Sequence, residues 1–337
     1  MSNTSVVLCT YNGVRFLEEQ LESLCKQTLR PRELIVSDDG STDGTVDLVR
    51  QFSSRAPFPV VISTNSVQLG YGENFLVAAQ KASSHLVAFC DQDDVWLPNK
   101  LERCEEGFSD ETVHLVAHTA ELIGARGERL GCLQQGITTH ELRAAGTQNP
   151  WNVFLGFSVV FRRALLEIAA KERRGPDSHD SQRLMAHDRW VFFLANTFCS
   201  TAVLAEPLVC YRQHSSNLFG AGRGARLRRL FEPTDKSLQR ARAHLLAAQS
   251  RGRLLEDIAS TASAARVRDL AERGQKLWER LARSEQKRLE LYEAASRGRR
   301  LSRWISNVAN DVYEDPLHAR LRKGAATVDL LACVKSS

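Results

Sequence analysis

The stretch "FCDQDDVWLP" (89–98) places three carboxylates, those of Asp91, Asp93 and Asp94, at the end of an apolar run. Carboxylates this close repel one another, and a bound cation or solvent relieves the repulsion. If the stretch is extended, Asp91 and Asp93 face one side and Asp94 faces the other. Carboxylate oxygens suit Mg²⁺ or Mn²⁺. We therefore predict that Asp93 binds one of these metal ions and that Asp91 contacts the ligand beside it.

Two further polar clusters follow apolar runs earlier in the chain. They are "TYN" (10–12) and "DDGS" (38–41). The carboxyl ends of neighbouring parallel strands meet at one edge of a sheet, and ligands bind there. An acidic strand end taken singly is more often a solvated turn. Three polar clusters brought to the same edge instead predict a binding site.

These residues could contact the base, the ribose and the diphosphate of a nucleotide sugar. A carboxylate that accepts the imide N–H of uracil or thymine recognises the base, and Asp38 is placed for this role. Asp39 and Ser41 are then available to the ribose or to the loop, and Asp91 to the ribose. The diphosphate leaving group needs its charge neutralised, and the predicted metal ion supplies this. The site is therefore expected to bind a nucleoside diphosphate sugar.

The predicted elements around these clusters alternate between strand and helix. Apolar β-rich runs predict strands at 5–11, 59–64 and 85–90, and "RPRELIVSDDGSTDGT" (30–45) predicts a further strand that ends in a carboxylate-glycine turn. Helical spacing predicts helices at 14–28, 74–82 and 98–108. This order is typical of β-α-β units on a mostly parallel sheet. The pattern then becomes more mixed, with strands at 113–118 and 157–161, a hairpin near 124–131 and a helix from about 187.

The C-terminal part differs in composition from the rest. Residues 1–220 carry 20 Lys/Arg and 26 Asp/Glu, a net charge of −6, whereas residues 221–337 carry 25 and 14, a net charge of +11. Helices are predicted at 226–231, 236–258 and 263–295. We therefore predict an α/β domain over residues 1–222 and a basic helical region over residues 223–337.

Two arginine clusters in the basic region, "GRGARLRRLF" (222–231) and "SRGRRLSRW" (296–304), also contain Leu, Phe or Trp. Such helices could lie on an anionic bilayer surface or contact a lipid-diphosphate acceptor. A solvated face or one that forms a homo-oligomer remains equally open. Nucleic acid is not expected as a partner, because no recognition motif is present and the first part of the chain is acidic.

The overall composition is that of an ordinary globular protein. The 337 residues are 43% hydrophobic and 25% charged, which is enough to build a sizeable core. The eight cysteines have no C-x-x-C spacing, so reduced thiols are expected. No apolar run approaches the ~18 residues of a spanning helix, and the first residues do not resemble a signal peptide. We predict a cytoplasmic protein.

Two segments together resemble a known family. "VVLCTYNGVRFLEEQLESLCKQTLRPRELIVSDDGSTDGT" (6–45) and "FCDQDDVWLPNKLE" (89–102) are similar to the family 2 glycosyltransferases, in particular to bacterial rhamnosyltransferase-like members. The resemblance covers most of residues 5–105. It implies the GT-A fold, a Rossmann-like domain for nucleotide-diphospho-sugars, with "DQD" as the family's DXD motif. It also implies that the nucleotide is lined by Thr10, Tyr11, Asn12 and Asp38.

Three shorter matches extend this resemblance. "LGYGENF" (69–75) is similar to a glycine-asparagine loop near the base, which makes Asn74 a candidate, although a simple helix start is as good a reading. "HDRW" (187–190) resembles the stretch that carries the catalytic base, which implies Asp188. "YRQHSSN" (211–217) resembles the segment whose histidine completes the metal site, which implies His214. The chain departs from the family at "GFSVVF" (156–161), which leaves the acceptor open.

The implied reaction is a direct, inverting transfer of a sugar to a hydroxyl of a glycan or lipid-linked acceptor, in surface polysaccharide or lipopolysaccharide synthesis. The resemblance favours L-rhamnose from dTDP-rhamnose as the donor sugar, and a UDP-sugar donor is the alternative. A nucleotidyltransferase would carry a basic, glycine-rich loop after the first strand, where this chain has "YNGVRFLEEQ". A non-catalytic nucleotide-binding module is the rival from another class, and it would not need the downstream motifs.

Overall fold

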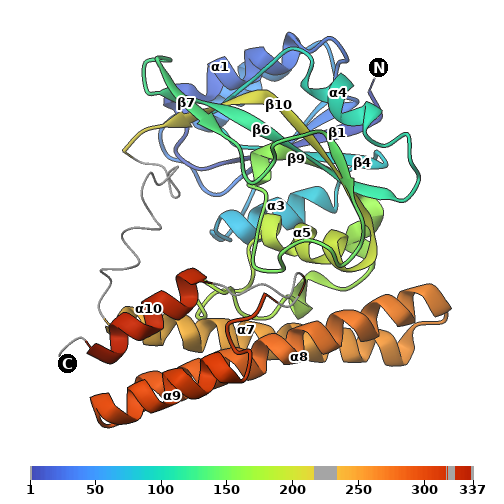
Figure 1. Cartoon of the computed structure of the whole chain (residues 1–337). Coiled ribbons are helices and arrows are strands. Elements are labelled where there is room, and N and C mark those ends of the chain that lie inside the picture. The colour runs from blue at the N-terminus through green and yellow to red at the C-terminus, as the bar shows by residue number, and fades with distance from the viewer. Residues whose placement is uncertain (1, 216–233, 316, 318–322, 335–337) are drawn as a thin grey trace. The chain divides into compact units, whose positions relative to one another are not determined.

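The computed structural model describes residues 2–215, 234–315, 317 and 323–334 (Figure 1). These residues cluster into two compact units. The first unit contains the described residues up to 171 together with 186–215, and the second contains 172–185 together with the described residues from 234 onward. The predicted domain boundary at residue 222 and the basic segment 222–231 lie outside the described residues.

The first half of the sheet in the first unit is parallel. Its strands are β1 (Thr4–Thr10), β2 (Glu33–Asp38), β3 (Val60–Thr64) and β4 (Leu86–Cys90), in the order β3-β2-β1-β4. Each neighbouring pair in this order is parallel. All seven residues of β1 are buried, as expected for a strand covered on both faces. The predicted β-α-β order is confirmed here.

The second half of the sheet is mixed. The order continues with β9 (Val159–Arg162), β6 (Val113–Gly124), β10 (Ser200–Gln213) and β5 (Val95–Trp96), while β7 (Arg129–Leu133) pairs with β6 and β8 (Glu141–Arg143) pairs with β10. Strand β9 is antiparallel to both β4 and β6, and β10 is parallel to β6. The two reversals give β6 and β10 the direction of β4. The carboxyl ends of β1, β2, β4 and β10 therefore lie at one edge.

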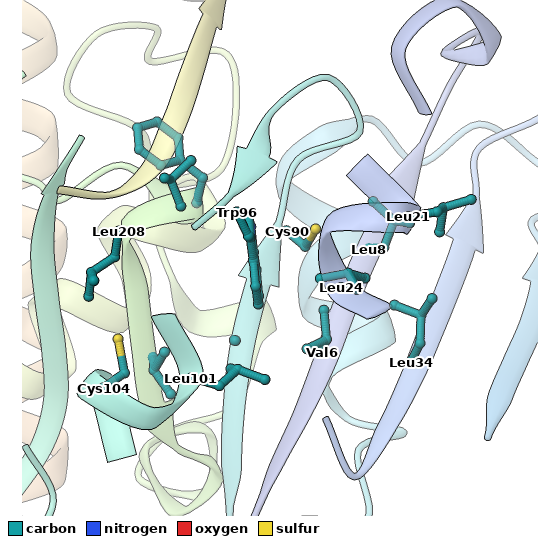
Figure 2. Close-up of a cluster of buried hydrophobic side chains, with 14 of the residues drawn as sticks. Val6, Leu8, Leu21, Leu24, Leu34, Cys90, Trp96, Leu101, Cys104 and Leu208 are labelled. Atoms are coloured by element: carbon teal, nitrogen blue, oxygen red, sulfur yellow. The ribbon is translucent and has the colours of Figure 1, made fainter. Parts of the chain in front are cut away.

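Helices on the sheet complete the first unit. They are α1 (Val14–Cys25), α2 (Thr45–Ser53), α3 (Tyr71–Ala79), α4 (Lys100–Glu106) and α5 (His187–Phe198), with 3-10 turns at Gly156–Ser158, Arg163–Glu167 and Lys171–Arg173. Leu17, Leu21 and Leu24 on α1 are fully buried. Figure 2 shows Leu21 and Leu24 beside core residues of the strands. Burying each of these leucines contributes about 2 kcal/mol to folding.

The second unit is helical. Helices α7 (Thr234–Thr261) and α8 (Ala265–Glu293) form a long hairpin, and α9 (Arg297–Ala309) and α10 (Lys323–Val334) follow (Figure 1). The predicted helices at 236–258 and 263–295 are confirmed to within a few residues, whereas α9 and α10 were not predicted. Among the described residues, no helix has the length and apolar character needed to cross a bilayer.

A buried polar cluster lies at the centre of the second unit. The carboxylate of Asp329 on α10 accepts hydrogen bonds from Arg288 at 2.8 and 2.9 Å, from the Tyr313 hydroxyl at 2.9 Å and from the Tyr292 hydroxyl. Arg288 also donates to Glu285 at 2.8 Å. A buried carboxylate is tolerated when it is paired and hydrogen-bonded in this way. The cluster therefore fastens α8 to α10 and to the residues before α10.

Candidate active site

The topology brings the predicted polar clusters to one edge of the sheet. The strand ends at Thr10, Asp38 and Cys90 lie there because β1, β2 and β4 are parallel. Strand β10 runs in the same direction and ends at Gln213, so His214 follows it at this edge. Helix α5 is joined directly to the start of β10 at the opposite edge. Its first turn, which contains Asp188, therefore points back toward the polar clusters.

The first cluster is fastened to its neighbours. The Thr10 hydroxyl donates to Asp38 at 2.8 Å, and the Asn12 backbone N–H donates to the Ser41 hydroxyl at 2.9 Å. The Tyr11 backbone exchanges two hydrogen bonds with the Gln92 side chain, at 2.9 and 3.1 Å. The Tyr11 ring itself is 47% exposed. The structure thus brings this cluster together with the acidic turn, and contact of Thr10, Tyr11 and Asn12 with a nucleotide stays a prediction.

The two carboxylates of "DDGS" already have protein partners. Asp38 is buried and accepts from the Thr10 and Ser41 hydroxyls and from the backbone N–H groups of Gly40 and Ser41, at 2.5 to 3.1 Å. Asp39 accepts at 2.8 Å from Asn65 and from two backbone N–H groups of the loop at 69–70. Both therefore order loops at this edge. Base recognition by Asp38 stays a prediction, and it would require one of these bonds to be exchanged.

Asn74 lies on α3 and is buried. Its Oδ1 accepts from the Ser37 hydroxyl at 2.6 Å and from Asn65 at 2.9 Å, and its Nδ2 donates to the Ser37 carbonyl at 2.9 Å. These bonds tie α3 to the end of β2. Because Asn65 also donates to Asp39, Asn74 supports the loop beside the predicted nucleotide. Direct contact of Asn74 with a nucleotide stays a prediction.

The acidic turn carries an excess of negative charge. Burial, together with the carboxylates of Asp93 and Asp188, raises the pKa of Asp91 to about 7. Burial and the neighbouring carboxylates of Asp93 and Asp91 raise the pKa of Asp94 well above its usual range. Asp188 is thus close enough to act electrostatically on Asp91. The structure therefore brings the predicted base and the acidic turn together, as the resemblance implied.

The predicted metal ligands lie in contact. His214 Nε2 is 2.7 Å from Asp93 Oδ2, and the His214 ring lies 4.8 Å from the ring of Phe16. Among the described residues, no group of three or more His, Cys, Asp and Glu side chains is assembled around a common point. Mg²⁺ commonly binds through one or two protein carboxylates together with phosphate oxygens and water. Asp93 and His214, beside the carboxylate repulsion that a cation would relieve, therefore fit a divalent ion.

The first turn of α5 is fixed by aromatic packing. The His187 ring stacks on Phe75 at 4.2 Å and meets Phe89 edge-on at 4.8 Å. Gly156 approaches so closely that a Cβ at that position would lie 2.5 Å from His187 Nε2. A side chain at position 156 would therefore displace His187. Asp188 follows on the half-buried side of this turn, where the helix N-terminus favours its charged form.

Arg212 is a functional residue that the sequence reasoning missed. It is 2% exposed, its Nε donates to the Asp93 carbonyl at 2.8 Å, and its guanidinium lies 4.8 Å above the Phe16 ring. Its backbone N–H also donates to Asp94 Oδ1 at 3.0 Å. Arg212 thus positions the acidic turn against the end of β10. An arginine within the otherwise strand-like "PLVCYRQ" (207–213) is the sequence signal that could have identified it.

Lys100 is a second residue that was missed. It is completely buried, its Nζ donates to the Phe157 carbonyl at 2.6 Å, and it lies 3.5 Å above the Trp96 ring. Burial lowers the pKa of Lys100 to about 8, although the carboxylates of Asp94 and Asp91 act in the opposite direction. The side chain links Trp96, which follows the acidic turn, to Phe157, which follows Gly156 beside His187. It therefore places a positive charge behind the excess carboxylates.

Comparison with known families shows which family the first half of the chain matches. Residues 5–168 match the family described as Glycosyl transferase family 2. This part of the chain belongs to that family. The matched residues include the first two polar clusters and the acidic turn, so the predicted family resemblance is confirmed. Asp188 and His214 lie beyond the matched residues, and their roles stay predictions.

Three curated proteins are similar to this chain. An uncharacterized glycosyltransferase of Nostoc is 30% identical over 217 residues, which cover 63% of this chain and 65% of that protein. The UDP-Glc:alpha-D-GlcNAc-diphosphoundecaprenol beta-1,3-glucosyltransferase WfgD of Escherichia coli is 35% identical over 98 residues, 29% of this chain and 38% of WfgD. The dTDP-rhamnosyl transferase RfbG of Shigella flexneri is 24% identical over 224 residues, which cover 64% of this chain and 74% of RfbG. The chain spans less than two thirds of the length of the first two of these proteins.

A solved structure with a similar fold is that of S. aureus TarS 1-349 in complex with UDP-GlcNAc. It aligns with a TM-score of 0.54 and 18% sequence identity over 92% of each chain. At this identity the likeness concerns the fold alone. The predicted fold class, a GT-A α/β domain with C-terminal helices, is confirmed.

Proposed function

We propose that this protein is a metal-dependent, inverting glycosyltransferase that moves a sugar from a nucleoside diphosphate donor to an acceptor hydroxyl. The observation that carries the proposal is the contact of His214 with Asp93 at 2.7 Å, beside Asp91, whose pKa is raised by burial and by the carboxylates of Asp93 and Asp188. Such a transfer needs ligands for one metal ion and a carboxylate base at the same edge of the sheet. Membership of part of the chain in the glycosyltransferase family supports it.

The metal ligands and the base have separate roles in the proposed reaction. Asp93 and His214 would bind Mg²⁺ or Mn²⁺, and the ion would neutralise the diphosphate as its bond to the sugar breaks. The acceptor oxygen attacks the anomeric carbon, the sugar–phosphate bond breaks, and the hydroxyl proton passes to the Asp188 carboxylate. The N-terminus of α5 favours the charged, proton-accepting form of Asp188. No covalent sugar–enzyme bond is required, so the anomeric configuration is inverted.

The proposed donor is dTDP-L-rhamnose, and the proposed acceptor is a glycan or a lipid-linked glycan of a surface polysaccharide or lipopolysaccharide. The similarity to RfbG over 64% of the chain supports the rhamnosyl donor. A UDP-sugar donor is the second candidate, because the similarity to WfgD reaches 35% identity over its 98 residues. Both donors present the imide N–H that Asp38 was predicted to recognise. We further propose a cytoplasmic site of action, where nucleotide sugars are made, and a homo-oligomer stays a prediction.

A donor screen with the full chain tests the proposal. Release of nucleoside diphosphate would be measured for dTDP-rhamnose, UDP-glucose and UDP-GlcNAc, with Mn²⁺, with Mg²⁺ and with chelator. We expect metal-dependent turnover that is fastest with dTDP-rhamnose. Turnover that is equally slow with all three would contradict the rhamnosyl donor. Diphosphate binding without turnover of any donor, even with acceptor glycans present, would favour the non-catalytic nucleotide-binding module.

The role of Asp188 has its own matched test. Asp188→Asn removes the proposed base, and we expect it to abolish transfer while nucleotide binding is retained. Asp47 also lies in the first turn of a helix, α2, but its side chain is 72% exposed in a pair with Arg50. Asp47→Asn should therefore transfer at the normal rate. Transfer by Asp188→Asn at the rate of Asp47→Asn would exclude Asp188 as the base.

A further inference from the structure

Among the described residues, hydrogen bonds pack one face of α9 against its neighbours. The Trp304 indole N–H donates to the Ala326 carbonyl of α10 at 2.9 Å, and the buried Asn307 side chain donates to the Lys287 carbonyl of α8 at 3.4 Å. The Arg300 side chain donates to the carbonyl of Ala294, just beyond the end of α8, at 3.1 Å. These contacts fix the rotation of α9 within the second unit. The face of α9 that is turned toward α8 and α10 is therefore known.

Beside its packed face, α9 exposes an apolar stripe. Leu301, Ile305 and Val308 are 42%, 56% and 37% exposed. Their spacing of four and three residues places them in one row along the helix. A row of three apolar side chains facing solvent is unfavourable unless something covers it. The stripe follows from the packing of Trp304 and Asn307, which turns these residues outward.

The charge around the stripe identifies what would cover it. Four arginines lie on α9, and no Asp or Glu occurs from residue 294 to residue 310. Arg297 is exposed and lies four residues before Leu301, so it extends the row toward the start of the helix. Residues 221–337 carry a net charge of +11. An apolar stripe with a cationic border is complementary to the surface of an anionic bilayer.

We propose that α9 docks the protein on an anionic lipid surface, with Leu301, Ile305 and Val308 in the interfacial layer and Arg297 near lipid phosphates. A second copy of the chain is disfavoured as the occupant, because it would bring the same four arginines against one another. The proposal goes beyond the proposed function and does not rest on it. It adds a surface on which a lipid-linked acceptor would be concentrated.

Vesicle sedimentation with the full chain tests this surface. The vesicles would be phosphatidylcholine alone, or equal parts of phosphatidylcholine and phosphatidylglycerol. We expect sedimentation with the anionic vesicles, reduced by high salt, and little with phosphatidylcholine. The triple variant Leu301→Ser, Ile305→Ser, Val308→Ser should lower vesicle affinity by about tenfold or more. Arg297→Glu should also lower it by about tenfold, with anionic vesicles only.

Leu246→Ser is the matched control, because Leu246 is also exposed, at 47%, but lies on α7. It should bind vesicles as the wild type does. Equal vesicle affinity of the triple variant and this control would overturn the proposal, as would binding to both vesicle types alike. Self-association in sedimentation velocity that the triple variant abolishes would instead assign the stripe to a second copy. No nucleotide sugar enters these measurements, so a failed donor screen leaves their result intact.

Discussion

The two units bury carboxylates in different surroundings. In the second unit, the carboxylate of Asp329 is matched by the Arg288 guanidinium and two phenol hydroxyls. In the first unit, the acidic turn at 91–94 gathers three carboxylates, and their repulsion contributes to the raised pKa of two of them. Arg212 contacts this turn and Lys100 acts on it electrostatically, yet the pKa of Asp91 stays raised.

This difference separates a structural cluster from a functional one. A protein gains nothing in stability from like charges placed together, so such a group indicates that a ligand completes it. The Asp329 cluster is complete within the chain and should act as a fastener. The acidic turn should act through a cation and a diphosphate. Substitutions in the acidic turn are therefore expected to lower activity without lowering stability. Substitutions in the Asp329 cluster are expected to lower stability.

The largest expected effect is on activity, at Asp93. Asp93→Asn removes one proposed metal ligand and one of the repelling charges. We expect the turnover rate to fall about 10³-fold or more, with a thermal unfolding midpoint equal to or slightly above that of the wild type. Metal-dependent donor turnover and calorimetry measure the two quantities. Asp47→Asn should change neither, and a lowered midpoint for Asp93→Asn would contradict the comparison of the two clusters.

The next effect is on stability, at Arg288. Arg288→Met leaves the buried Asp329 and Glu285 without their cation, and breaking such a pair costs about 3–5 kcal/mol. Urea unfolding followed by tryptophan fluorescence measures the loss. Arg283→Met is the control, because Arg283 lies on the same helix with its side chain 70% exposed. An Arg288→Met protein as stable as this control would show that the cluster does not fasten the second unit.

The strands and their polar ends were predictable because local sequence determines them. The buried runs that end at Thr10, Asp38 and Cys90 predict both the strands and the edge where they meet. Strand β10 was missed, since it contains Pro207 and its register to β6 shifts on both sides of that residue. A ladder interrupted in this way has no regular alternation in the sequence.

The residues that support the acidic turn could not be predicted from local patterns. Lys100 meets the carbonyl of Phe157 across 57 residues, and Arg212 meets Asp94 across 118 residues. Only the folded sheet shows that these positions adjoin. Asp188 and His214 were identified through the family resemblance, because a carboxylate at a helix start and a lone histidine carry no specific signal of their own.

Lys100 gives the comparison a pH dependence. In the folded protein the pKa of Lys100 is lowered by burial to about 8, from 10.5 in an unfolded chain. Between these values the unfolded chain binds more protons, so this group makes the free energy of unfolding rise with pH. Lys100→Met removes the term. The free energy of unfolding of the wild type minus that of the variant should increase from pH 8 to pH 10.5 by up to about 3 kcal/mol.

Urea titrations at a series of pH values, from neutral to strongly alkaline, measure this difference. Taking the difference cancels the tyrosines and cysteines that titrate in the same range. Lys26 is exposed, and Lys26→Met is the control for replacing a lysine by methionine. A pH-independent difference for Lys100→Met would mean that the lysine keeps its proton in the folded protein. It would then act as a permanent counter-charge behind the acidic turn.

The smallest expected effect concerns Arg212, which contacts the acidic turn without being a proposed ligand. Arg212→Met removes the hydrogen bond to the Asp93 carbonyl and the packing on Phe16, which in turn lies against His214. Supporting residues of this kind change metal affinity by about 10–100-fold. We therefore expect a higher Mn²⁺ requirement, with much of the maximal rate recovered at saturating metal.

Measuring the rate against Mn²⁺ concentration distinguishes this positioning role from general damage to the fold. The control is Arg50→Met, because Arg50 lies on α2 in an exposed pair with Asp47. It should leave the Mn²⁺ requirement unchanged. A maximal rate that falls while the Mn²⁺ requirement stays constant would place the effect of Arg212 elsewhere than on the Asp93 and His214 pair. Recovery at high metal would instead mean that Arg212 acts by positioning the metal ligands, because excess Mn²⁺ then compensates for its loss.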